Sequence, residues 1–246
     1  MTVTIAGSGP AVAAVEAALG DAGIETTTGI ETLGETALAV VAGETGADIF
    51  DRANEHASET DSRWLAIELG GLGGYPVADA AVAGFAPDAG CYDCLRGRVA
   101  ANLDESANLD EGASDTGDTS ETLAPETARF AGAVAGREAV RWLAGDADVG
   151  GRIVVAPFSE REFLPLPNCG CADERDPGLD RAAVERTVEE SLARAERALD
   201  EQVGVVQEVG EAESFPVPYY LAQTCATDGF SDASAARQAA GVAVDW

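Results

Sequence analysis

Lysine is missing from the 246-residue sequence, so all 15 basic residues are arginine, and histidine occurs once. Against them stand 44 acidic residues, which give a formal net charge of −29. A surface this acidic repels nucleic acid and anionic membranes, so binding to either is not expected. We interpret the charge as a halophile's adaptation, because many carboxylates keep a protein surface hydrated in molar salt.

Long apolar runs are also missing. No stretch approaches the roughly 20 apolar residues that span a bilayer, and no basic segment precedes an apolar one at the N-terminus, as a signal peptide would require. Thiols suited to metal binding persist in a reducing compartment. The sequence therefore predicts a cytoplasmic protein without a membrane partner.

The five cysteines are unevenly placed, because four of them form two tight pairs. Cys91 and Cys94 have C-x-x-C spacing, and Cys169 and Cys171 have the tighter C-x-C spacing. Two such pairs, far apart in the chain, suit a tetrahedral four-thiolate zinc site, since each short loop offers two sulfurs to one ion. A disulfide or redox pair and unliganded core thiols are the alternatives. A closed four-thiolate site has a structural role and no open position for catalysis.

The N-terminus has the pattern of a strand, a glycine turn, a helix and a second strand. Thr2–Ala6 is a short apolar strand that Gly7 and Gly9 follow at once, and then 11–19 reads as a helix and 24–28 as a strand. This order predicts a parallel, Rossmann-like sheet in an α/β protein.

The glycine turn departs from the dinucleotide fingerprint. In G-x-G-x-x-G the third glycine would stand at Val12, and Pro10 removes an N–H from the turn that would hold phosphate. We therefore predict Gly7 and Gly9 to be a vestigial cofactor site. The alternative is that these glycines only let the helix pack close to the strand.

Further apolar segments continue the alternation of strands and helices. Between them, 103–125 is rich in Asp, Glu, Ser, Thr and Gly, which predicts a flexible acidic insertion. The expected strands are 37–42, Trp64–Leu69, 82–85, 152–158 and 162–166, and the expected helices are 47–58 and 127–144. The inner face of the second helix is expected to carry Phe130, Val134, Ala135, Ala139 and Trp142.

Two motifs resemble a known family. Residues 91–98 read Cys-Tyr-x-Cys-Leu-x-x-Arg, and the later helix carries Ala-Gly-Arg-Glu-Ala-Val at 135–140. With the glycine turn and the second cysteine pair, residues 1–172 resemble the ThiF/MoeB-like adenylating fold. They resemble most its degenerate form in the cyclodehydratase partner proteins of thiazole/oxazole-modified peptide pathways. The resemblance implies that the four paired cysteines bind structural zinc, although the family's second pair is usually C-x-x-C.

The same resemblance bears on activity. Adenylating members need a phosphate-binding glycine loop, a magnesium-binding acid, and arginine and lysine contacts to the triphosphate. This sequence has no lysine and no D-x-D-x-V motif followed by Asn-Leu-x-Arg-Gln, so we expect no adenylation. In the peptide-maturation relatives the degenerate domain is a scaffold that docks to the catalytic protein and helps present the substrate.

The C-terminal part resembles another family. After an Asp-Pro-Gly break at 176–178, 180–199 reads as a helix, and 203–209 and 215–222 read as strands. Residues 199–206, followed by the proline-bearing strand, resemble the opening of a YcaO domain. That family's acidic ligands for ATP and magnesium are absent. We therefore expect ATP and magnesium only in the remainder of the domain, supplied by a longer polypeptide or by a partner chain.

The predicted organisation is a zinc-bearing ThiF-like domain at 1–175 and a truncated, YcaO-like α+β segment at 176–246, whose open strand edges would allow a homodimer. The predicted function is non-catalytic scaffolding and substrate docking in a YcaO-type protein that modifies a peptide or protein backbone with ATP, by azoline cyclodehydration or thioamidation. Two alternatives stay open: an active adenylyltransferase for a ubiquitin-like sulfur carrier, and a zinc-stabilised binding module. The sequence does not decide whether the chain is an enzyme.

Overall fold

The computed structural model contains an α/β body followed by a smaller C-terminal segment. It describes residues 1–87, 89–103, 124–157, 159–166, 169–172, 187–211, 219–225 and 238–244. At Arg194 and from position 207 onward it describes the backbone alone. The predicted acidic insertion lies outside the described residues apart from its two ends, and so does the Asp-Pro-Gly break.

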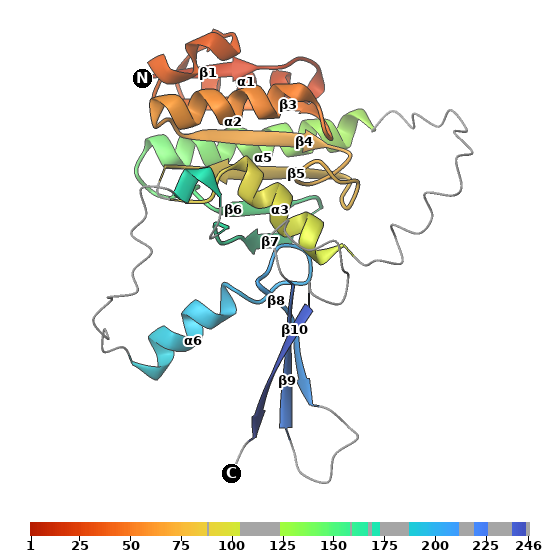
Figure 1. The fold of residues 1–246 in the computed structure, drawn as a ribbon. Coiled ribbons are helices and arrows are strands. Elements are labelled where there is room, and N and C mark those ends of the chain that lie inside the picture. The colour runs from red at the N-terminus through yellow and green to blue at the C-terminus, as the bar shows by residue number, and fades with distance from the viewer. Residues whose placement is uncertain are drawn as a thin grey trace, which may run out of the picture.

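A seven-stranded sheet forms the centre of the body, with the strand order β2-β1-β3-β4-β5-β6-β7 (Figure 1). The first four strands in this order pair in parallel, and the last three join antiparallel. Parallel neighbours need crossover connections, which is why helices alternate with these strands in the sequence. The strands are β1 (Thr2–Ala6), β2 (Glu25–Thr28), β3 (Leu38–Glu44), β4 (Trp64–Leu69), β5 (Ala80–Phe85), β6 (Arg152–Val155) and β7 (Ser159–Glu162).

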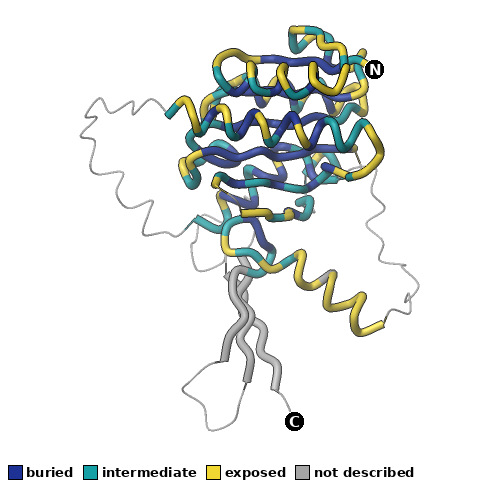
Figure 2. Tube along the Cα trace, turned by 180° about the vertical axis from the view of Figure 1, so that it is seen from behind, coloured by how far each residue is buried: buried dark blue, intermediate teal, exposed yellow. Residues whose placement is uncertain are grey.

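Helices cover both faces of the sheet. The helices α1 (Pro10–Asp21) and α5 (Pro125–Leu143) pack on one face. The other face carries α2 (Asp48–Thr60), α3 (Tyr92–Asn102) and the 3-10 helix η1 (Ile30–Glu35). Because both faces are covered, the central strands are nearly continuous apolar runs, such as the Leu-Ala-Val-Val-Ala start of β3. Figure 2 shows these strands as a buried layer between helices with exposed outer faces.

Two glycines of α5 allow it to pack closely against α1. A Cβ on Gly132 would lie 2.1 Å from the backbone oxygen of Ala11, and a Cβ on Gly136 would lie 2.6 Å from the Cβ of Ala18. These gaps are far below van der Waals contact, so no larger side chain fits unless the two helices move apart. The spacing of four residues places both glycines on one face of α5.

The inner face of α5 differs in part from the sequence prediction. The two predicted alanines are buried, but Phe130, Val134 and Trp142 are only half-buried. Small residues occupy the centre of the contact because the close approach to α1 leaves no room for larger ones. The helix also begins at Pro125, two residues earlier than predicted, where the missing N–H of proline is not needed.

The hairpin that ends the sheet turns earlier than predicted. The strand β6 ends at Val155 and β7 spans Ser159–Glu162, instead of strands at 152–158 and 162–166. Pro157 lies in the turn, because a residue without an N–H cannot continue the hydrogen-bond ladder. Residues 163–166 therefore leave the sheet and lead toward the second cysteine pair.

Beyond position 186 the described chain forms α6 (Val188–Glu196) and a three-stranded antiparallel sheet of order β10-β9-β8 (Figure 1). Thr187 and Glu190 make a capping box at the start of α6, and the helix start predicted at 180 lies outside the described residues. None of the described helices is long and apolar enough to cross a bilayer. The strands are β8 (Val206–Glu211), β9 (Tyr219–Cys225) and β10 (Gln238–Val244).

A turn between α6 and β8 contacts the α/β body. Val203, predicted to begin a strand, is instead buried in the core that α3 shares with the sheet. Arg161 of β7 forms an ion pair with Asp200 at 2.6 Å, with both side chains mostly buried. The side-chain amide of Asn102 donates to the backbone oxygen of Gly204 at 3.1 Å. Apolar and polar contacts together thus attach this turn to the body.

Candidate metal centre

The first cysteine pair is placed by the start of α3. Cys91 is the N-cap residue and Cys94 lies in the first turn, so both thiols belong to one end of the helix. Asn54 of α2 fixes this end: its side-chain oxygen accepts a hydrogen bond from the N–H of Tyr92 at 2.9 Å, and its amide donates to the carboxylate of Asp93 at 2.9 Å. Sequence reasoning missed Asn54, because its contact joins positions 38 residues apart.

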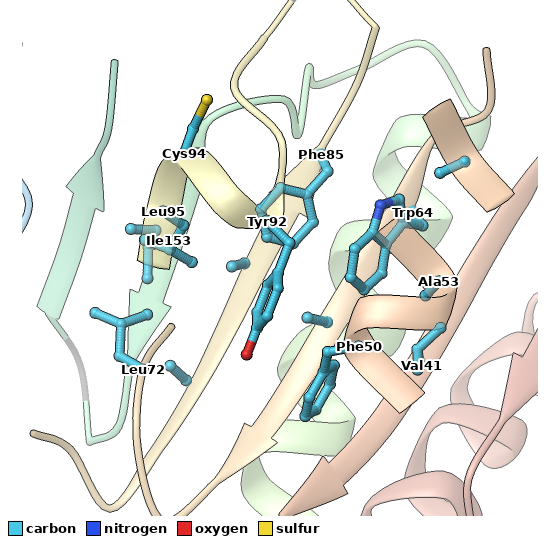
Figure 3. Packing of buried hydrophobic residues seen from close by; sticks show 14 of the residues in the cluster. Val41, Phe50, Ala53, Trp64, Leu72, Phe85, Tyr92, Cys94, Leu95 and Ile153 are labelled. Carbon is cyan, nitrogen blue, oxygen red and sulfur yellow. The ribbon is translucent and has the colours of Figure 1, made fainter. Parts of the chain in front are cut away.

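An aromatic layer holds α3 against the sheet (Figure 3). The fully buried ring of Tyr92 lies 5.5 Å from that of Phe50, 6.1 Å from Trp64 and 5.9 Å from Phe85. Cys94 is buried as well, and Figure 3 shows its sulfur at the opposite end of this layer from the Tyr92 hydroxyl. Close-packed rings of this size leave α3 little freedom, so the position of the Cys94 sulfur is well defined.

A buried arginine brings the second pair toward the first. Arg98 of α3 is 4% exposed and donates to the backbone oxygens of Leu164 and Pro165, each at 3.0 Å. A buried guanidinium needs such acceptors, and here they hold the segment that leaves β7. The next residue, Leu166, donates its N–H to the sulfur of Cys94 at 3.2 Å. An N–H aimed at a thiolate ligand is the kind of supporting contact that metal centres use.

The structure brings all four predicted thiols together. The sulfurs lie within 4.8 Å of one another, at 3.8 Å between Cys91 and Cys94, 3.5 Å between Cys91 and Cys169, and 3.4 Å between Cys94 and Cys171. Four sulfurs placed about 2.3 Å from one zinc ion at tetrahedral corners stand about 3.8 Å apart. The cluster therefore has the size of a one-metal site, and the C-x-C pair reaches it. No other group of three or more His, Cys, Asp or Glu side chains with this geometry occurs in the described part of the chain.

The same distances show free thiols and not disulfides, whose S–S bond is about 2.05 Å long. The hydrogen bond to Cys94, followed by burial, raises the pKa of the Cys91 thiol, and burial raises the pKa of the Cys169 thiol. These thiols hold their protons when no cation is near. Because a metal binds thiolates, its uptake releases protons and its affinity falls as the pH falls.

The predicted cofactor glycines lie in the tight turn between β1 and α1. Gly7 has a φ of 115° and Gly9 a φ of 94°, a region that favours glycine. A Cβ on Gly7 would lie 2.3 Å from the backbone oxygen of Ala42 on β3, whereas no atom lies within 4 Å of such a Cβ on Gly9. Close packing of two backbone segments thus accounts for Gly7 without a ligand. Cofactor binding at this turn stays a prediction.

A buried carboxylate that sequence reasoning missed lies near the start of α3. Glu68 of β4 is 2% exposed, and its oxygens accept hydrogen bonds from the N–H groups of Gly73 and Gly74 at 2.6 Å and from the Tyr92 hydroxyl at 3.4 Å. Burial raises the pKa of Glu68 although these bonds oppose the shift. The available signal was one acid inside an apolar strand followed by a run of glycines. The carboxylate fixes the glycine loop beside the aromatic layer.

Replacing Glu68 by glutamine is expected to lower the free energy of unfolding by about 1–3 kcal/mol at neutral pH, because the amide nitrogen would face an N–H donor. The folded carboxyl takes up its proton at a higher pH than the unfolded one, so wild-type stability relative to Glu68→Gln should rise as the pH falls from neutral toward about 4.5. Chemical denaturation across this range measures both effects. The exposed control Glu44→Gln should track the wild type, and parallel curves for Glu68→Gln would contradict the prediction.

No protein-family model matches the chain, and no curated protein sequence matches it. Solved structures do match. A heterocyclase in complex with substrate and cofactor aligns with 90% of this chain, at a TM-score of 0.59 and 22% sequence identity. The likeness is one of fold, and the chain spans 34% of the heterocyclase chain that it matches.

Escherichia coli MccB gives a looser match. MccB alone aligns with 76% of this chain and 67% of its own, with a TM-score of 0.48 and 11% identity. MccB with ATP aligns with 69% of this chain and 66% of its own, with a TM-score of 0.47 and 12% identity. The seven-stranded sheet between two helical layers, together with the heterocyclase match, agrees with the predicted α/β, Rossmann-like fold.

Proposed function

We propose that this chain is the scaffold and substrate-docking region of a YcaO-type protein, which uses ATP to convert peptide-backbone amides into azolines or thioamides. The heterocyclase match carries the proposal, because nine-tenths of the chain aligns with a third of an enzyme that holds a substrate and a cofactor. An alignment of that extent includes more than the α/β body. It continues into the segment whose sequence resembles the opening of a YcaO domain.

The α/β body supplies no chemistry in this proposal. Its turn after β1 packs Gly7 against the backbone of Ala42, and the chain has no lysine to contact a phosphate. These features favour a scaffold over an adenylyltransferase. When bound, zinc would cross-link the start of α3 to the segment after β7. Four thiolate ligands would leave it no open coordination position. Its ligands would be Cys91, Cys94, Cys169 and Cys171.

The partner of the C-terminal segment would be the rest of the YcaO domain, on the same polypeptide or on another chain. On α6, Val188 is 70% exposed and Leu192 is 57% exposed, and Leu199 just beyond the helix is 45% exposed. Figure 2 shows α6 coloured as exposed. Val188 and Leu192 are four residues apart on α6, so they lie on one face of the helix and form an apolar stripe that none of the described residues covers. Within the described residues, β8 and β10 are the outer strands of their sheet, and no further strand lies beside either of them. In this proposal, ATP and magnesium bind to the rest of the YcaO domain. The two domains of the present chain are then 1–175 and 176–246.

The stripe provides the test of this proposal. Combined with the rest of the YcaO domain, the wild-type chain should support an ATP-dependent mass change in the substrate peptide. The double variant Val188→Ser/Leu192→Ser should lower that rate at least about tenfold, because burying two such side chains contributes several kcal/mol to docking. The melting temperature of the variant chain alone should not change, since both side chains are exposed. Mass spectrometry of the peptide measures the rate.

Glu189→Gln is the matched control, because it changes an exposed residue of the same helix outside the stripe. Full activity of the serine variant would contradict docking through α6. ATP–pyrophosphate exchange by the chain alone, stimulated by a ubiquitin-like sulfur carrier, would support the adenylyltransferase instead.

A further inference from the structure

A cleft of about 440 Å³ opens onto the cysteine cluster beside α2. Cys91, Cys169 and Cys171 line it and are half-buried, whereas Cys94 is fully buried. Together with Cys94, these three thiols form the one cluster of metal-ligand type in the described part of the chain. A cation that enters through this cleft would therefore meet three of its four ligands without any movement of α3.

The walls of the cleft carry four carboxylates, Asp51, Glu55 and Glu59 from α2 and Asp93 from α3. Arg96 lies beside them, where it forms an ion pair with Asp51 and approaches Asp93 at 3.6 Å. None of the described residues that line the cleft is basic. Glu55 and Glu59 stand one helical turn apart, are exposed, and form no ion pair with the described residues.

We propose that Glu55 and Glu59 are the entry site through which the metal ion reaches and leaves the thiolates. The inference rests on the proposed metal centre and adds a kinetic role to residues outside it. Carboxylate oxygens bind a hydrated divalent cation weakly and displace some of its water. The ion then passes to the softer sulfurs, each of which releases its proton to solvent as its metal bond forms.

A transient site of this kind acts on rates and not on final occupancy. It lowers the barrier between solvent and the thiolates in both directions, so uptake and release change together while the bound state is unaltered. The net charge of −29 also attracts cations, but that long-range attraction is screened within about 3 Å at molar salt. Direct contact with Glu55 and Glu59 persists in molar salt. A comparison of low and molar salt therefore distinguishes the local effect of Glu55 and Glu59 from the general attraction by the net charge.

The test follows the exchange of bound zinc for added cadmium in the full chain, through the ultraviolet absorption of cadmium–thiolate bonds. In molar KCl, Glu55→Gln/Glu59→Gln is expected to slow this exchange about tenfold and to keep about one metal ion per chain. The control is Glu16→Gln/Glu126→Gln, which makes the same change of charge on α1 and α5 at the opposite face of the sheet. The control should exchange at the wild-type rate.

Equal exchange rates in the two double variants would overturn the entry site, and so would an effect that appears at low salt but vanishes in molar KCl. A loss of bound metal from the Glu55→Gln/Glu59→Gln variant would show a ligand role and would also overturn it. If the proposal of a metal centre is itself wrong, the result differs from these outcomes, because the wild-type chain would then contain no zinc to exchange. Thermal unfolding of both variants verifies that each is folded.

Discussion

Replacing Cys94 by serine is expected to remove the metal from the chain and to destabilise the α/β body. Wild-type protein should contain about one zinc ion per chain, and Cys94→Ser less than about 0.2. Cys94 is fully buried, and its sulfur contacts that of Cys171 at 3.4 Å and accepts the N–H of Leu166. A serine hydroxyl is a poor zinc ligand at neutral pH, so the tie between α3 and the segment after β7 would be lost.

The expected loss of stability is several kcal/mol, because structural zinc sites contribute on the order of 10 kcal/mol or more in small domains and the present core retains other contacts. Metal analysis and thermal unfolding measure the two effects. A chelator should lower the melting temperature of the wild type but not of Cys94→Ser. The fifth cysteine supplies the control, since Cys225 belongs to β9 and to neither of the two cysteine pairs, and Cys225→Ser should keep its metal. Equal zinc content in both variants would refute the metal centre.

Replacing Gly132 by alanine is expected to lower the free energy of unfolding by roughly 3 kcal/mol or more. The new Cβ would lie 2.1 Å from the backbone oxygen of Ala11 and 2.8 Å from its carbonyl carbon, and no flexible side chain can yield there. The two helices must separate, which opens the packing of α1 and α5 over the sheet. For a chain of this size the melting temperature should fall by roughly 6–12 °C.

The matched control is Gly20→Ala on α1. Gly20 is a helical glycine, and no atom lies within 4 Å of its Cβ position. Alanine there should raise stability by about 0.4–1 kcal/mol, since it restricts the unfolded chain without a clash. The two substitutions make the same chemical change, so opposite signs would isolate packing as the cause. A neutral Gly132→Ala would mean that α5 does not approach α1 as described.

Several elements could be predicted from the sequence because their cause is local. The strands Thr2–Ala6 and Trp64–Leu69 have the predicted bounds, since short apolar runs flanked by turn residues leave few alternatives. Two cysteine pairs were sufficient to predict a convergence of four thiols. The strand predicted at 162–166 was wrong, because Pro157 sets the turn of the hairpin earlier and Phe163 enters the core from outside the sheet.

Features that depend on contacts between positions far apart in the chain could not be predicted from the sequence. Nothing in the sequence around Asn54 indicates that it caps α3, and nothing around Arg98 shows that its acceptors are the backbone oxygens of Leu164 and Pro165. Glu68 resembles an exposed acid until the glycine loop folds over it. In each case the partner lies elsewhere in the chain, and only folding brings the two groups together.

The acidic surface, the alternation of strands and helices and the pairing of cysteines could be predicted from the amino-acid sequence, because each depends on residue type and short spacing. The residues that hold those cysteines in place, and the surfaces that the cysteines face, became visible only in the folded chain. In the folded chain, the glycine turn that resembled a nucleotide-binding turn makes a close backbone contact between Gly7 and Ala42. The cysteine cluster faces a cleft that carboxylates of α2 also line. The physical reason is that burial and electrostatic environment depend on what packs around a residue, which spacing along the chain does not specify.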